Sequence, residues 1–125
     1  MIDNNIWNDL LEAIYGNQPE QVKFYLCLAK DVNDLGPDTA TTLLMHAAFA
    51  GHKHILLLLL QAGALVSKKD DVGWTAVDYA WSTQHVELAH WLTKEGKNRE
   101  GVKVIAQKWV KFGVRYSERG TDGQA

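Results

Sequence analysis

Residues 42–52 read TLLMHAAFAGH, and a second copy of this pattern, TAVDYAWSTQH, follows at residues 75–85. The two copies begin 33 residues apart, and each ends on a histidine at the same offset. A fixed period of this length is typical of proteins built from stacked repeats, in which each repeat is one supersecondary unit. The period therefore predicts a repeat architecture and gives the frame in which the other elements are placed.

Each copy carries the signals of a short helix. Thr42 and Thr75 can act as N-caps, because a threonine hydroxyl accepts hydrogen bonds from the free backbone N–H groups of the first turn. Asp78, three residues after Thr75, can complete a capping box. Gly51 and Gly63 can take the left-handed conformation that ends a helix. One repeat therefore holds two helices.

On these residues the chain resembles the ankyrin-repeat family, whose unit of about 33 residues is a β-turn followed by two helices. The resemblance implies an all-α solenoid of about three helix-turn-helix repeats joined by hairpin loops. We expect the repeats at about residues 7–39, 40–72 and 73–96. It also implies a structural role for His52 and His85, since the family commonly has histidine at this position.

The middle repeat departs from the family pattern at three positions. Leu43 stands where proline is usual, Met45 where histidine is usual, and Ala40 where the turn glycine is usual. The next hairpin matches better, because Gly73 supplies a permissive backbone and Asp70 can hydrogen-bond the turn.

The first repeat is more divergent. Its helices are expected at residues 10–14 and 19–26, with Gly16-Asn17 as the stop between them and Pro19 in the first turn of the second. Val22 matches Leu56 at a spacing of 34, which indicates one inserted residue, and the turn-forming segment 34–38 is where we expect it.

The second helix of the middle repeat contains six consecutive apolar residues at 55–60. This run is far too short to span a bilayer. A helix that is apolar on all sides is expected to be buried on all sides. The run therefore predicts a central helix with neighbours on both sides.

The third repeat is expected to form helices at residues 76–82 and 86–94 and to end near Gly96. Beyond it, apolar residues recur along one stripe of a helix, namely Val102, Ile105, Trp109, Phe112 and Tyr116. We interpret residues 99–113 as a capping helix over the last repeat, with Trp81 filling space beneath it. Residues 117–125 are small and polar and are expected to be a disordered tail, so that residues 1–116 form a single domain.

Composition gives few further constraints. With 125 residues, 46% of them hydrophobic, the chain is expected to be one domain with a real core. Residues 1–96 carry 6 basic and 12 acidic side chains, and residues 97–125 carry 7 basic and 3 acidic ones, so an acidic body precedes a basic end. Cys27 is the single cysteine, and residues 1–14 have no signal-peptide pattern, so we expect a cytoplasmic protein.

No residue pattern indicates catalysis, a cofactor or a metal site. His52 and His54 point to different sides of a helix, as do His85 and His90, and no cysteine or carboxylate completes a ligand set. Cys27 has no histidine near it in sequence to act as a base, so a packed thiol is expected rather than a nucleophile. We expect neither an enzyme nor a small-molecule substrate.

Recognition of another protein is therefore the expected function. Proteins similar to ankyrins bind with their hairpin tips and with the exposed side of the first helices. The partner-binding residues that this implies here are Tyr15, Phe49, Asp71, Trp74 and Thr83. The three aromatic residues among them have no evident core role and are of a kind enriched in interface hot spots, although Trp74 could instead fold back on its own hairpin.

Two versions of this function remain open. The chain could be a small inhibitor, an immunity protein or an accessory protein, monomeric on its own until it meets its partner. The alternative is an adaptor that contacts a membrane or nucleic acid through the basic side of the C-terminal helix, formed by Lys103, Lys111 and Arg115. We favour the protein partner, because the apolar stripe is sufficient explanation for that helix as a cap.

Overall fold

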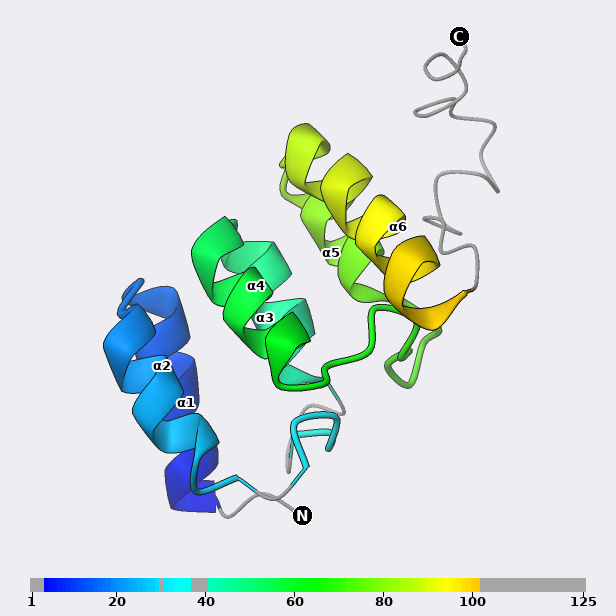
Figure 1. The fold of residues 1–125 in the computed structure, drawn as a ribbon. Helices are drawn as coiled ribbons and strands as arrows, with labels where there is room; N and C mark the ends of the chain where they lie inside the picture. Colours follow the sequence, from blue (N-terminus) through cyan, green and yellow to red (C-terminus); the bar gives the residue numbers. More distant parts are fainter. Residues whose placement is uncertain (1–3, 30, 37–40, 102–125) are drawn as a thin grey trace, which may run out of the picture.

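The structure, a computed structural model, describes residues 4–29, 31–36 and 41–101. Its helices are α1 (Asn4–Tyr15), α2 (Pro19–Leu26), α3 (Leu43–Ala50), α4 (Lys53–Gln61), α5 (Ala76–Ser82) and α6 (Val86–Glu100). They form three antiparallel pairs that stand side by side (Figure 1). No strand occurs in the described ranges, and the expected all-α repeat fold is confirmed.

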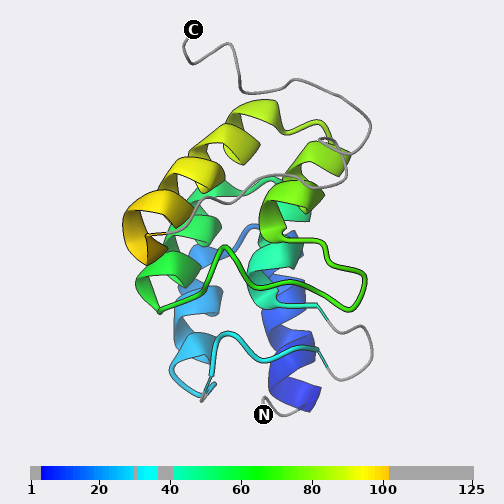
Figure 2. The same ribbon diagram turned by 90° about the vertical axis from the view of Figure 1, so that its right-hand side faces the viewer.

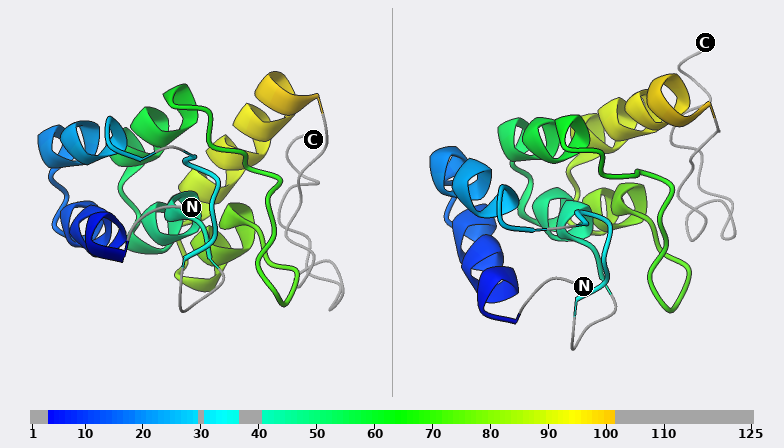
Figure 3. Two further views of the ribbon diagram at one scale, coloured as in Figure 1. Left: turned by 90° about the horizontal axis from the view of Figure 1, so that it is seen from below. Right: turned by 60° about the horizontal axis from the view of Figure 1, so that its bottom comes forward.

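The helices lie in two layers. Figure 2 shows α1, α3 and α5 stacked in one column and α2, α4 and α6 in the other. The long loop between α4 and α5 lies on the side of the first column, and the views in Figure 3 show it extending beyond the helices. We call α1, α3 and α5 the inner layer and α2, α4 and α6 the outer layer.

The helices begin and end largely where their sequence signals stand. The Thr42 hydroxyl accepts from the Met45 N–H at 3.3 Å, and the Thr75 N–H donates to the Asp78 carboxylate at 2.9 Å. Gly51 ends α3 in the left-handed region with φ 81°. At the end of α1 the left-handed residue is Asn17, with φ 54°, so asparagine performs the reversal there.

The middle pair forms the centre of the core. Helix α3 packs against α1 on one side and α5 on the other. Ala47, Ala48 and Ala80 are buried at these contacts, where small side chains allow helices to approach closely. The core therefore runs continuously through the inner layer from Trp7 to Val77.

Helix α4 corrects one expectation. Ile55, Leu56, Leu59 and Leu60 are buried, but Leu57 and Leu58 are half-buried. The outer layer has protein on only one face, so a helix in it keeps a partly exposed side even when it has a neighbour along the stack. The apolar run is thus not buried all round.

Helix α6 is longer than the sequence indicated. It continues past Lys94 and through the buried Gly96 to Glu100, and Gly101 ends it with φ 72°. Residues 99 and 100, expected to begin a capping helix, therefore belong to α6. Residues 102–113 of that predicted helix and the predicted tail lie outside the described residues, as does the contact expected between that helix and Trp81.

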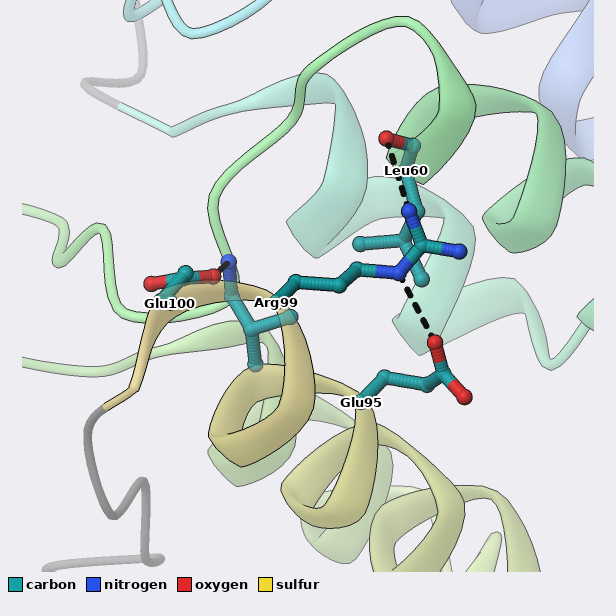
Figure 4. A network of polar contacts seen from close by, with 5 residues as sticks. Leu60, Glu95, Arg99 and Glu100 are labelled. Carbon is teal, nitrogen blue, oxygen red and sulfur yellow. Dashed lines mark hydrogen bonds and ion pairs between the residues drawn. The ribbon is translucent and has the colours of Figure 1, made fainter.

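The last turn of α6 is tied to the middle repeat (Figure 4). Arg99 pairs with Glu95 at 2.8 Å and donates to the Leu60 carbonyl at 3.4 Å. The Glu100 carboxylate accepts from the backbone N–H of Val66 at 2.6 Å and of Ser67 at 3.2 Å, and from the Ser67 hydroxyl. These bonds satisfy backbone groups in a loop that has no secondary structure of its own.

The same loop is held from the other side by the first repeat. The Asn33 side chain donates to the Gly63 carbonyl at 3.0 Å and accepts from the Leu65 N–H at 2.7 Å. Side chains from both neighbouring repeats thus fix residues 63–67, which keeps the loops in register along the stack.

Candidate functional site

A pocket of about 200 Å³ opens on the inner layer between the three repeats. Its walls come from α1, α3 and α5 and from one residue two positions before α3, and they consist of Tyr15, Thr41, Met45, His46, Phe49 and Tyr79. Most of this lining is aromatic or apolar. Because the residues come from each repeat in turn, the pocket exists only when the stack is assembled.

His46 organises the side of the pocket nearest α1. Its Nδ1 is 2.8 Å from the Tyr15 hydroxyl and its Nε2 is 2.8 Å from the Thr41 hydroxyl. The rings of Trp7 and Tyr15 meet the imidazole edge-to-face, with centroids 6.0 and 5.7 Å away. Burial lowers the pKa of His46, so the ring is held neutral at neutral pH.

Tyr15 is positioned by this histidine although 45% of its surface is exposed. Burial of the rest of the side chain raises the pKa of its hydroxyl. A tyrosine with a fixed hydroxyl and an uncovered ring presents a rigid amphipathic surface, which is the form in which tyrosine contributes to interfaces.

The side of the pocket nearest α5 is built on Asp70. Its carboxylate accepts from the N–H of Val72 at 3.0 Å and of Trp74 at 2.8 Å, which folds the hairpin, and from the Tyr79 hydroxyl at 2.5 Å. Burial and the bond to Asp70, followed by the charges of Asp70, Asp71 and Asp78, raise the pKa of Tyr79. One carboxylate therefore locks both the turn and the tyrosine.

Three aromatic rings meet at this end of the inner layer. Tyr79 lies edge-to-face with Trp74, at 5.2 Å between centroids, and with Phe49, at 6.4 Å. Phe49 keeps 46% of its surface exposed. Together, Tyr15, His46, Phe49, Tyr79 and Trp74 form a continuous row across the three repeats, which we call the aromatic row.

The residues predicted from sequence are distributed unevenly over this geometry. Tyr15 and Phe49 line the pocket, and Trp74 joins it through Tyr79. Trp74 is half-buried, and its ring lies against Tyr79 of α5. Asp71 is exposed beside Asp70, outside the pocket lining.

Thr83 lies apart from the row, at the C-terminal end of α5. Its hydroxyl bonds the carbonyls of Tyr79 and Ala80, at 3.1 and 3.3 Å, and lies 2.8 Å from His85 Nδ1. The Thr83 hydroxyl therefore bonds groups at the C-terminal end of α5, and Thr83 does not line the pocket.

Sequence reasoning missed the two residues that organise the row, His46 and Tyr79. They are 33 residues apart, at the same position of successive repeats, and that spacing is the signal that could have revealed them. His46 lies one turn before Phe49 in α3, and Tyr79 occupies the equivalent position in α5. Both side chains line the pocket.

A larger pocket, of about 440 Å³, lies between the beginnings of α4 and α6. The ring of Trp91 there is covered by the Lys53 ammonium, 4.9 Å from the ring centroid. His85 is packed under Gly51 and bonded to Thr83. The aromatic row is the better candidate, because its rings come from all three repeats, whereas this pocket is lined mainly by the beginnings of α4 and α6 and the residues before them.

Two other kinds of site find no support in the described part of the chain. Its histidine, cysteine and carboxylate side chains form no cluster of three or more that could hold a metal ion. Cys27 is exposed at the end of α2, so the expectation of a packed thiol is wrong. None of the helices in these ranges combines the length and the apolar character needed to cross a membrane.

Comparison with known proteins assigns the repeats. A family model described as ankyrin repeats, in three copies, matches residues 10–103, about three quarters of the chain. A search of curated proteins found no match. The family match covers all of the helices that build the aromatic row except the first residues of α1.

Proposed function

Because this chain belongs to the ankyrin-repeat family, whose repeats are generally protein–protein interaction modules, we propose that it binds a partner protein through the aromatic row. The observation that carries the proposal is the row itself. It exposes large rings from all three repeats on one continuous surface, and each ring is fixed by a neighbour within the molecule.

Fixed aromatic surfaces favour tight binding for a physical reason. A side chain that is already ordered loses little conformational entropy when a partner covers it, so more of the contact energy appears as affinity. Tyr15 is ordered by its bond to His46, and Tyr79 by its bond to Asp70. Phe49 and Trp74 are packed against Tyr79.

We propose binding rather than catalysis for this surface. Its groups that could exchange protons are His46, Tyr15 and Tyr79, and the hydrogen bonds of each serve here to orient the rings. The ankyrin-repeat family is typically non-catalytic. We therefore propose a module without enzymatic activity, with Asp71 at the rim of the interface.

The biological setting belongs to the proposal too. A small repeat stack with a binding surface of this kind suits a protein that acts by covering part of its partner, such as an inhibitor, an immunity protein or an accessory protein. We place it in the cytoplasm, because a lone cysteine suits a reducing compartment. We also propose that the chain is monomeric until it binds.

Affinity capture with three baits tests the proposal. The wild-type chain, Phe49→Ala and Phe24→Ala would be immobilised and exposed to lysate of the source cell. Phe24 is a matched control, because it is an exposed aromatic residue, at 61%, on the outer helix α2. We expect a protein retained by the wild type and Phe24→Ala but lost from Phe49→Ala. Retention by all three baits would place the binding surface elsewhere.

A further inference from the structure

The size of the inner-layer pocket restricts what it can hold. Pockets for drug-sized molecules and cofactors span roughly 300–1,000 Å³, whereas this pocket is about 200 Å³. It lies within the aromatic row and opens on the surface that we propose for protein binding. One protruding side chain of a partner is the occupant that matches this size.

The walls of the pocket favour a cation over other side chains. Tyr15, Phe49 and Tyr79 come from three different helices, and Tyr15 and Phe49 keep 45% and 46% of their surface exposed. Tyr15 meets His46 at 77° and Phe49 meets Tyr79 at 73°, so these rings are not stacked face to face. The face of an aromatic ring carries negative charge density and attracts ammonium and guanidinium groups. Rings from several directions strengthen this attraction, because each contributes its own field.

The carboxylates nearest the pocket come from the hairpin before α5, which also carries the exposed Lys68 and Lys69. Asp70 is bonded to the Tyr79 hydroxyl, and Asp71 and Asp78 are close enough for their charges to act on that hydroxyl. Over the ranges that the structure describes, neither Asp70 nor Asp71 forms an ion pair with a lysine or arginine. His46, the one basic group in the lining, is held neutral by the burial that lowers its pKa.

The remainder of the body is also acidic. Residues 1–96 carry 12 acidic and 6 basic side chains. On α1, the exposed Glu12 lies one turn before Tyr15. A positively charged partner would thus be attracted before contact and retained after it.

Resting on the proposed function, we propose that the pocket receives a lysine or arginine side chain from a basic segment of the partner. The cationic head lies among the rings of Tyr15, Phe49 and Tyr79, with Asp70 and Asp71 on the hairpin side. An apolar anchor, such as leucine, would fit the lining but would gain nothing from the carboxylates.

Selection from a random library of displayed 12-residue peptides on the immobilised full chain tests this inference. The most enriched peptide is then synthesised in three forms: with its basic anchor, with citrulline, which keeps the shape of arginine without its charge, and with norleucine, which is apolar. Affinities are measured for the wild type, Phe49→Leu, Phe49→Ala and Phe24→Ala.

We expect an arginine or lysine common to the enriched peptides and roughly tenfold weaker binding of the citrulline form, given the usual strength of a desolvated cation–π contact. Phe49→Leu should weaken the arginine form several-fold and leave the norleucine form unchanged, since leucine keeps the apolar wall but lacks a ring face. Phe24→Ala should bind as the wild type does.

The outcomes separate this inference from the function on which it rests. Peptides that depend on Phe49 but bind equally well with norleucine would overturn the cationic anchor and leave the binding face intact. Enriched peptides whose affinity is unchanged by both Phe49→Leu and Phe49→Ala would overturn the cationic anchor and the proposed binding face. So would a selection that enriches no peptide.

Discussion

Position 51 is restricted to glycine for two separate reasons. Its φ of 81° lies in the left-handed region, and a Cβ placed there would be 2.5 Å from Nε2 of His85. Gly63 has a φ of 100° but nothing within 4 Å of the position of its missing Cβ. Substitution of Gly63 therefore tests backbone strain alone, whereas substitution of Gly51 tests backbone strain together with a steric clash.

We predict that Gly51→Ala destabilises the protein more than Gly63→Ala does. Strain in the left-handed region costs roughly 1–2 kcal/mol in both variants. Displacement of the His85 ring adds about 1–3 kcal/mol in Gly51→Ala alone, the usual range for overpacking. Urea unfolding of both proteins measures the difference, and equal losses would show that His85 moves away freely.

His46 should make stability depend on pH. Because burial lowers its pKa, the unfolded chain holds more protons than the folded chain between the two pKa values, and the free energy of unfolding rises with pH there. The contribution is complete above about pH 6.5, the ordinary histidine pKa, and declines as the pH falls below it.

Urea unfolding between about pH 7 and pH 5, above the range in which most carboxylates titrate, measures this decline. We predict a shallower decline in His46→Gln than in the wild type, whatever the absolute stability of the variant. His54→Gln, at an exposed position of α4, is the control and should keep the wild-type slope. An unchanged slope in His46→Gln would refute the role of burial at this residue.

At the scale of single residues, the sequence predicted where a side chain lies on its helix better than it predicted which residues that side chain contacts. Tyr15 and Phe49 follow from the repeat frame, and both line the pocket. Thr83 followed from the same frame, but its hydroxyl is used by the end of α5. Frame positions say which way a side chain leaves the helix, whereas its hydrogen bonds depend on neighbours that are distant in sequence, as His46 and Tyr15 show.

Among the elements, α4 is the one whose burial was predicted wrongly, because its apolar run suggested a helix buried on all sides. Leu59 is fully buried, and the adjacent Leu58 is half-buried. We predict that Leu59→Ala lowers the free energy of unfolding by about 2–5 kcal/mol, as cavity-forming substitutions do. Leu58→Ala should lose only about 1 kcal/mol, because less apolar surface returns to water. Chemical denaturation of the pair checks this, and similar losses would mean that α4 is enclosed on both faces after all.

The end of α6 shows why helix boundaries are hard to predict. A glycine such as Gly96 can end a helix or allow close packing within it, and the buried Gly96 does the second. The continuation to Glu100 is supported by the Glu95–Arg99 pair one turn apart and by basic residues in the last turn, which favour a helix C-terminus. These signals lie in the sequence but are weaker than a glycine.

Glu100 should therefore stabilise the loop that it reaches. We predict that Glu100→Ala lowers the free energy of unfolding by about 2 kcal/mol, because a carboxylate that accepts several hydrogen bonds is lost. Hydrogen exchange should become faster at the amides of Val66 and Ser67. The matched change Lys94→Ala, at an exposed site earlier in the same helix, should stay within about 0.5 kcal/mol. Unchanged exchange at both amides would show that the loop is held by other contacts.

For the molecule as a whole, the fold could be predicted because it repeats. A period of 33 residues fixes the helix pairs, their order and their shared inner face, whatever the departures at single positions such as Leu43 and Met45. The identity of the partner does not follow in the same way, since the scaffold leaves its surface residues free to vary. What the surface does carry is the aromatic row and its acidic surroundings.

The central claim is that binding depends on the aromatic row and not on the basic C-terminal segment. The direct measurement is the affinity of the captured partner, together with the thermal midpoint, for Phe49→Ala, Phe24→Ala and a variant in which Lys103, Lys111 and Arg115 are replaced by glutamine. We predict that Phe49→Ala loses at least about 2 kcal/mol of binding energy, roughly thirtyfold in Kd, with an almost unchanged midpoint. The other two variants should bind nearly as the wild type does. Normal binding by Phe49→Ala together with loss of binding in the glutamine variant would contradict the account and move the site to the C-terminal segment.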